Sequence, residues 1–182
     1  MRSKKDDILE AAATLFSHKG VDGVSVPQIL TLANASAGAM YSYFKSKQEL
    51  ADAVFRRADQ AVYGALWHQF PYQIKVKEQF YTLWRRYFRL LDEDRLSVSL
   101  SFLNSCHEVD LGETHEQMLR ELCQIWREDV DAHIEISVDS MVLLIRGVMS
   151  YTWSVEAERY MHLEKELVDS IWRSFLREDG DS

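Results

Sequence analysis

The segment from residue 106 to residue 116 gathers side chain types that bind metal ions or act in nucleophilic catalysis. The candidates are Cys106, His107, Glu108, Asp110, Glu113, His115 and Glu116. The segment lacks the CxxC and HExxH spacings of zinc sites, and acidic loops with occasional histidines are usually solvated. Neighbouring residues of a helix point about 100° apart, so Cys106 and His107 make a poor pair of nucleophile and base. We therefore expect no metal, no cofactor and no catalytic residue, and we do not expect an enzyme.

A second segment, residues 33–47, combines very small side chains with aromatic and basic ones. Residues 33–39 have the sequence ANASAGA, and MYSYFKSK follows directly. Before it, Ser25 and Gln28 have the spacing of a capping box, which predicts the start of a short helix. That helix is expected to bury Ile29, Leu32 and Ala33, and to end at Asn34, since Asn tolerates the left-handed conformation. Ser36 can cap another helix that runs to about residue 43.

Two short helices joined by such a turn form a helix-turn-helix, whose second helix lies in the major groove of DNA. Small side chains at 37–39 let the backbone approach the duplex, and the free N–H groups of a helix start favour a phosphate. Tyrosine hydroxyls can reach phosphate oxygens, and a lysine in the next helix adds positive charge. Met40 and Phe44 are expected to face the protein. The predicted DNA-binding residues are Ser25, Ser36, Ala37, Gly38, Ala39, Tyr41, Tyr43 and Lys47.

The whole chain shows helical periodicity and no strand pattern, which predicts an all-α fold of about nine helices. An apolar fraction of 47% with 12% aromatic residues can bury a sizeable core, and seven Gly and two Pro are few. The expected helices cover about residues 3–19, 25–33, 36–43, 46–70, 74–91, 96–108, 114–133, 137–153 and 163–176. The helix over 74–91 has two apolar stripes, so we expect it to be packed on two sides.

The charge of the chain is divided unequally between its parts. Residues 1–57 carry a net charge of +2 and the remaining residues −10, within a total of −8. This asymmetry is typical of a small basic module attached to an acidic body. No secretory signal or membrane span is visible, so we expect a cytoplasmic protein with no membrane partner, whose Cys106 and Cys123 are reduced thiols.

The first 55 residues resemble the N-terminal domain of the TetR family of bacterial transcriptional repressors. The resemblance is carried by ILEAAATLFSHKG and by SVPQILTLANASAGAMYSYFKSKQEL, with the spacing preserved throughout. It implies a helix-turn-helix DNA-binding domain at 1–46, with three helices, and a helical effector-binding and dimerisation domain at 47–182. It further implies a homodimer that binds a near-palindromic double-stranded DNA operator and responds to a small-molecule effector.

The chain departs from the family pattern where the family reads DNA bases. Ala37 and Ala39 stand where the family often has Lys, Pro or Arg and Thr, and Tyr43 where it often has His. Alanine offers methyl contacts and no hydrogen bonds, so specificity is expected to come from thymine methyl groups and DNA shape.

The acidic body has many aromatic side chains, which could line an effector cavity or simply form the core. The candidate ligand-binding residues are Trp67, Phe80, Trp84, Phe88, Phe102, Trp126, Met149 and Trp153. We expect an apolar or aromatic effector. The last helices have broad apolar surfaces, which predict a dimer interface, with burial inside one chain as the alternative. The predicted interface residues are Val148, Thr152, Leu167, Ile171, Trp172 and Phe175.

The sequence thus favours a homodimeric, ligand-released repressor, although repression and activation are not distinguished. An alternative is a DNA-binding structural or partner-binding protein of the same fold without an effector, for which a fully packed body would argue. An enzyme would require a convergent acid and base cluster that the spacing does not show.

Overall fold

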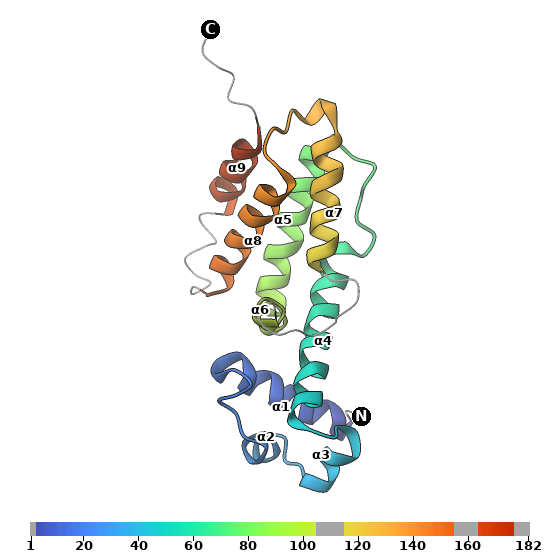
Figure 1. Ribbon diagram of the computed structural model, residues 1–182, viewed down its shortest axis with the longest axis vertical. Helices are drawn as coiled ribbons and strands as arrows, with labels where there is room; N and C mark the ends of the chain where they lie inside the picture. The colour runs from blue at the N-terminus through green and yellow to red at the C-terminus, as the bar shows by residue number, and fades with distance from the viewer. Residues whose placement is uncertain (1–2, 105–114, 155–163, 177–182) are drawn as a thin grey trace. The chain divides into compact units, whose positions relative to one another are not determined.

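The computed structural model describes residues 3–104, 115–154 and 164–176. Within these residues the chain forms nine α-helices and one short 3₁₀ turn, and no β-strand, which confirms the predicted all-α fold (Figure 1). The helices are α1 (Lys4–Lys19), α2 (Val26–Leu32), α3 (Ala37–Tyr43), α4 (Lys47–Trp67), α5 (Val76–Glu93), α6 (Arg95–Asn104), α7 (His115–Glu128), α8 (Val138–Ser154) and α9 (Glu164–Phe175), with η1 (Val130–Ala132) after α7.

The chain divides into two compact units. The first comprises Met1–Val62 with Leu96–Gly112, and the second comprises Tyr63–Arg95 with Glu113–Ser182. The division falls inside α4, whereas the sequence analysis places a domain boundary after residue 46, where that helix starts.

The first unit is built around a single apolar core. Ile8, Ala12 and Phe16 of α1 are buried together with Ile29 of α2 and Met40 of α3. The start and end of α1 follow the usual capping chemistry. The Ser3 hydroxyl accepts the backbone N–H of Asp6 at 3.2 Å, and Gly20 ends the helix with a φ of +66°. The three short helices are therefore held by side chain burial and by caps.

The second unit is organised around α5, as its two apolar stripes predict. The Phe80 ring lies 5.8 Å from the Trp126 ring of α7 and 5.1 Å from the Trp172 ring of α9, measured between centroids. The buried hydroxyl of Tyr87 lies 2.7 Å from the carbonyl oxygen of Met149 and 2.7 Å from the Thr152 hydroxyl, both in α8. Helices α7, α8 and α9 therefore pack around α5 (Figure 1).

Arg86 of α5 closes the C-terminal end of α4. Its guanidinium donates hydrogen bonds to the carbonyls of Leu66, His68 and Gln69 at 2.8, 2.8 and 3.1 Å, and lies 5.4 Å from the centre of the Phe70 ring. The last carbonyls of a helix have no partner within it, so Arg86 satisfies groups that would otherwise need water.

Replacing Arg86 with methionine should lower the free energy of unfolding by about 2 kcal/mol, since hydrogen bonds from a charged donor are lost and the apolar stem is kept. Urea denaturation monitored by circular dichroism measures this change. Lys77→Met, at an exposed position of the same helix, is the control and should have little effect. Equal stability of the Arg86 variant and the parent would contradict the capping role.

Candidate nucleic-acid interface

The turn between α2 and α3 has the predicted geometry. Asn34 adopts a φ of +46°, in the left-handed region that Asn tolerates better than most residues. The backbone N–H of Ala35 donates to the Leu30 carbonyl at 3.0 Å, which closes the turn. Lys4 of α1 donates to the Asn34 carbonyl at 3.3 Å. The predicted end of α2 at Asn34 is therefore supported by three local features of the turn.

Helix α3 has one buried and one exposed face. The Ser36 hydroxyl accepts the backbone N–H of Ala39 at 3.1 Å, as predicted for a helix cap. Met40 is fully buried and Phe44 is 3% exposed, so both face the protein as expected. Ala37 and Gly38, in contrast, lie on the exposed surface. The small residues are therefore on the solvent side at the beginning of the helix.

The aromatic side chains after them are also accessible. Tyr41 is 54% exposed and Tyr43 is 45% exposed. Ala39 is half-buried, and Ser25 and Ser36 are exposed at the starts of α2 and α3. The Ser25 backbone N–H donates to the Gln28 carboxamide oxygen at 2.8 Å. The predicted residues of α3 are thus exposed apart from the half-buried Ala39, and Ser25 is exposed at the start of α2.

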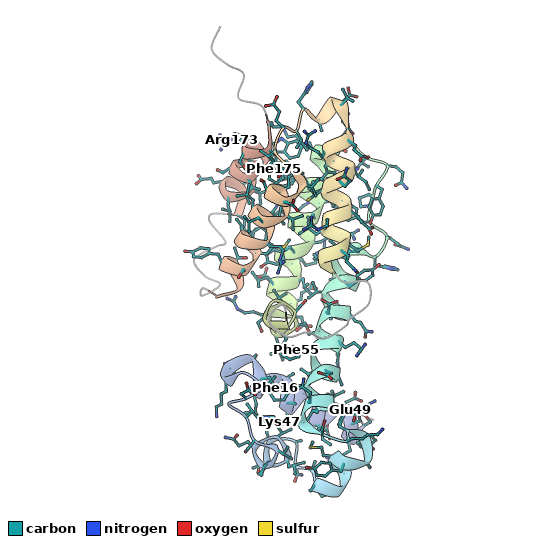
Figure 2. The ribbon with its side chains drawn as sticks, in the orientation of Figure 1. Phe16, Lys47, Glu49, Phe55, Arg173 and Phe175 are labelled. Atoms are coloured by element: carbon teal, nitrogen blue, oxygen red, sulfur yellow. The ribbon has the colours of Figure 1, made fainter. Side chains whose placement is uncertain are left out.

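Lys47 has a different environment from that expected of a simple phosphate contact. Its half-buried ammonium donates to the carbonyls of Val21 and Val24 at 2.8 and 3.0 Å. Lys47 and Glu49 lie at the beginning of α4 (Figure 2). The backbone N–H of Lys45 donates to the Glu49 carboxylate at 2.7 Å. Lys47 therefore joins the start of α4 to the connection between α1 and α2.

Two features of this unit escaped the sequence analysis. Leu32 was expected to be buried, but it is 55% exposed because it lies at the last position of α2, directly before the turn. Lys5 of α1 places its ammonium 5.8 Å from the centre of the Phe44 ring, next to the end of α3. The cluster of basic residues near the N-terminus could have indicated that Lys5 belongs to the DNA-binding region. Its proximity to Phe44, however, depends on tertiary packing.

The predicted ligand-binding aromatics are mainly core residues. Phe80 and Trp126 are fully buried in the ring cluster around α5, and Trp67 and Met149 are 5% and 2% exposed. The side chains of Phe102 and Trp153 lie outside the described residues. Trp84 and Phe88 of the predicted set line a surface groove between α5 and α9. The structure thus separates this pair from the other predicted residues.

The predicted interface residues require a similar revision. Thr152 and Phe175 are fully buried, and Ile171 and Trp172 are each 6% exposed, in the core of one protomer. They are covered by their own chain, so they cannot form a partner-facing surface without repacking. Val148 and Leu167 are half-buried.

The accessible apolar surface lies elsewhere on α8. Leu143 is 73% exposed and Tyr151 is 63% exposed. Gly147, midway between them, has open space where a side chain would begin. The spacing of four residues places all three on one face of the helix.

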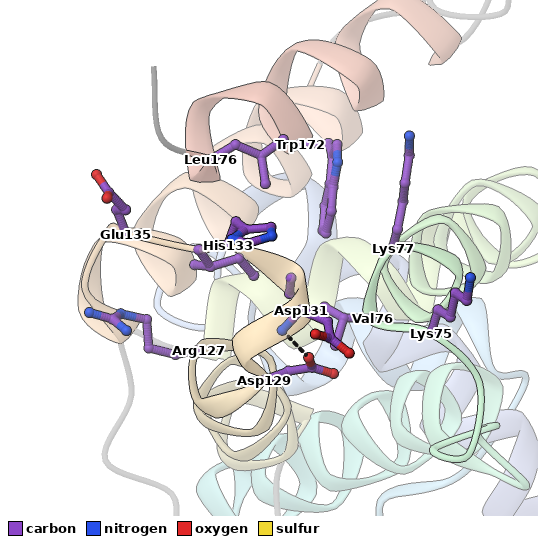
Figure 3. A pocket seen from close by; sticks show the side chains of 12 residues that line it. Lys75, Val76, Lys77, Arg127, Asp129, Asp131, His133, Glu135, Trp172 and Leu176 are labelled. Carbon is purple, nitrogen blue, oxygen red and sulfur yellow. Dashed lines mark hydrogen bonds between the residues drawn. The ribbon is translucent and has the colours of Figure 1, made fainter. Parts of the chain in front are cut away.

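A larger groove of about 1180 Å³ is formed by the start of α5, the end of α7, η1 and the end of α9 (Figure 3). Its lining carries both signs of charge: Lys75, Lys77 and Arg127 face the same space as Asp129 and Asp131. The Asp129 carboxylate accepts the backbone N–H of Asp131 at 2.9 Å, so it serves to shape the turn. The mixed charges give this groove no single ligand chemistry.

The candidate side chains for metal binding lie outside the part of the chain that the structure describes. Residues 106–114 of the metal-like cluster lie outside the described residues, as do the side chains of His115 and Glu116. Within the part of the chain that the structure describes, no three His, Cys, Asp or Glu side chains converge on a possible metal site. Burial raises the pKa of the Cys123 thiol to about 12, so it stays protonated at neutral pH.

Comparison with known proteins gives the context of this geometry. Residues 8–54 match the model of "Bacterial regulatory proteins, tetR family". The transcriptional repressor KstR2 of Mycolicibacterium smegmatis is 35% identical over 54 residues, which are 30% of this chain and 26% of that protein. An uncharacterised HTH-type transcriptional regulator of Haemophilus influenzae is 29% identical over 103 residues, 54% of this chain and 55% of that one. The chain thus spans from about a quarter to about half of the length of these relatives.

The fold similarity extends over nearly the whole chain. The ketosteroid transcriptional regulator KstR2 of Mycobacterium tuberculosis superposes with a TM-score of 0.75 over 98% of this chain and 97% of that one, at 15% identity. In the described residues, no helix has the length and hydrophobicity needed to cross a bilayer. The described chain thus shares the all-helical fold of a solved TetR-family regulator, and its helix-turn-helix region, residues 8–54, belongs to the TetR family of bacterial regulatory proteins.

Proposed function

We propose that this protein is a DNA-binding transcriptional regulator whose homodimer binds a near-palindromic operator and is released by an apolar or aromatic ligand. The observation that carries the proposal is the exposed start of α3, where Ala37 and Gly38 leave the backbone open to a duplex. Since α3 follows a helix and a tight turn, it has the position of a recognition helix in a helix-turn-helix. The N-terminal +2 charge supports an anionic partner.

Each half of the operator would be contacted in two ways. The methyl groups of Ala37 and Ala39 can contact thymine, and Gly38 permits a close approach of the backbone. Tyr41 and Tyr43 can donate to phosphate oxygens, which fixes the position of the helix without reading sequence. Lys5 adds charge at the nearby start of α1, where Lys4 is paired with Asp7 at 3.0 Å. Binding should therefore depend strongly on salt and on DNA shape.

Operator binding can be tested by recovering bound genomic fragments and measuring their affinity at several salt concentrations. The logarithm of the affinity should fall linearly with the logarithm of salt concentration. Tyr41→Phe should lower affinity by about fivefold for all recovered sequences, since one hydrogen bond is worth about 1 kcal/mol. Tyr72→Phe, in the second unit, is the matched control. Unchanged affinity of the Tyr41 variant would remove that hydroxyl from the interface.

Lys47 acts in this proposal by positioning the start of α4, because its ammonium is already held by two carbonyls. Lys47→Met should lower the free energy of unfolding by about 2 kcal/mol and weaken DNA binding, while leaving the salt dependence unchanged. A direct phosphate contact would instead reduce the slope of the logarithm of affinity against the logarithm of salt concentration by about 0.9. Denaturation and binding titrations measure both quantities, with Lys19→Met as control. A reduced slope with unchanged stability would restore the phosphate role.

The homodimer is proposed to form through the face of α8 that carries Leu143, Gly147 and Tyr151. Apolar side chains with this exposure are typical of association surfaces when they are contiguous, and a glycine between them lets two helices approach closely. The half-buried Val148 and Leu167 can extend the contact. The buried residues named in the sequence analysis would support this surface from beneath.

Gly147→Arg should convert the dimer to a monomer, because a long charged side chain would stand between the two helices. Within one protomer a Cβ at this position meets nothing within 4 Å, so helical content should be retained. Gly64→Arg is a matched control, since Gly64 is also exposed in a helix with open space around it. Sedimentation velocity measures the outcome, and a dimeric Gly147 variant would place the interface elsewhere.

The proposed effector is a lipophilic small molecule. KstR2 of Mycobacterium tuberculosis, which has the same fold, is a ketosteroid transcriptional regulator, and this supports a lipophilic effector class. The alternative, a DNA-binding protein without an effector, is favoured by the close packing of Phe80 with Trp126 and Trp172. A thermal-shift screen followed by an assay of operator release decides between them. An effector must both raise the melting temperature of the protein and release it from operator DNA.

A further inference from the structure

A groove of about 430 Å³ runs between α5 and α9 in the second unit. Its volume is within the range of small-molecule sites. The apolar lining consists of Tyr81, Trp84, Phe88 and Val168. The Trp84 and Phe88 rings are 5.7 Å apart between centroids and inclined by 31°. They are 1% and 8% exposed, so they form an almost completely buried aromatic lining.

The Trp84 indole adds a polar feature to this lining. Trp84 is 1% exposed, and its Nε1 hydrogen-bond donor is buried without an acceptor in the described residues. A buried donor without a partner is uncommon in folded proteins and costs free energy. Trp84, which lines the groove, therefore carries a donor that the protein leaves unsatisfied.

The basic side chains of the groove are Arg85 and Arg89, one helical turn apart on α5, and Lys165 on α9. Arg85 donates to the Thr82 hydroxyl at 2.9 Å. This partner is neutral, so it does not compensate the positive charge of Arg85. Among the described residues, Arg89 and Lys165 have no hydrogen-bond or ion-pair partner. Three cationic groups thus border the aromatic lining, and none of them contacts a carboxylate of the described part of the chain.

The acidic side chains are Asp92 and Glu164, at the end of α5 and the start of α9. Burial and the neighbouring Asp92 raise the pKa of the Glu164 carboxyl. At the opposite end, the Tyr81 hydroxyl donates to the Asp169 carboxylate. Three basic side chains therefore face two acidic ones in the groove lining, and Arg85 and Arg89 lie between its two ends.

We propose that this groove binds an aromatic organic anion, with its acidic group beside the exposed Arg85 and Arg89 and its ring in the space that Tyr81, Phe88 and Val168 line. The inference rests on the proposed function, because it identifies the groove as the effector site. Guanidinium groups favour carboxylates through paired hydrogen bonds, and they also stack on flat rings. A neutral or cationic molecule of the same shape would lack the paired hydrogen bonds between its acidic group and the guanidinium groups.

Three probes of the same shape test the ligand class: 2-naphthoate, 2-naphthamide and 2-naphthylmethylammonium. Calorimetric titration of the full chain should give a dissociation constant for 2-naphthoate at least tenfold lower than for either of the others. Equal binding of all three probes, tighter binding of the cation, or no binding of 2-naphthoate would each overturn the proposal.

Charge reversal tests the position of the acidic group. The double variant Arg85→Glu, Arg89→Glu should lose at least tenfold in affinity for 2-naphthoate and gain affinity for 2-naphthylmethylammonium. Lys77→Glu changes an exposed charge of the same helix outside this groove and should leave the order of the probes unchanged. Retained 2-naphthoate affinity in a folded double variant would place the site elsewhere.

Operator DNA separates this inference from the proposed function. Selective 2-naphthoate binding that also weakens operator binding supports both. Operator binding by a protein that does not bind 2-naphthoate overturns the groove assignment alone. Selective, arginine-dependent 2-naphthoate binding without any operator binding supports the ligand class and overturns the regulator function.

Discussion

A seven-residue helix is not stable by itself in water, and this constraint governs the first unit. Helix α3 is held by the burial of Met40 and Phe44 and by the Ser36 cap. Burying these side chains fixes which face of α3 meets the core. The same choice exposes Ala37, Gly38 and Tyr41 on the remaining face. Packing on one side of α3 thus determines the surface that the proposed function uses on the other side.

Two further contacts fix the connections around α3. Asn34 takes the left-handed conformation that reverses the chain between α2 and α3, and Lys4 bonds its carbonyl. Lys47 then joins the start of α4 to the connection between α1 and α2 through two carbonyls. Because all these contacts lie within one unit, a displacement at the beginning of α4 would be felt by the segment before α2. This gives a physical basis for coupling between α4 and the proposed DNA-binding surface.

The sequence predicted the elements well because the signals involved are local. The Ser36 cap, the left-handed Asn34 and the burial of Met40 and Phe44 follow from neighbouring residues, and the structure has all of them. Prediction was weaker where the identity of the neighbouring element mattered. Periodicity gives α9 two apolar stripes, but it does not state that Trp172 meets Phe80 of the same chain. Likewise, the role of Lys47 depends on two carbonyls more than twenty residues away.

Gly38 offers the most direct measurement of the central claim, that a thin α3 lets the backbone reach DNA. A Cβ at this position would meet only the Ser36 hydroxyl, at 4.0 Å, and leucine favours helix over glycine by somewhat less than 1 kcal/mol. Gly38→Leu should therefore keep or slightly raise the free energy of unfolding while lowering operator affinity by at least about tenfold, roughly 1.4 kcal/mol. Operator affinity equal to that of the parent, in a variant of equal stability, would contradict the account.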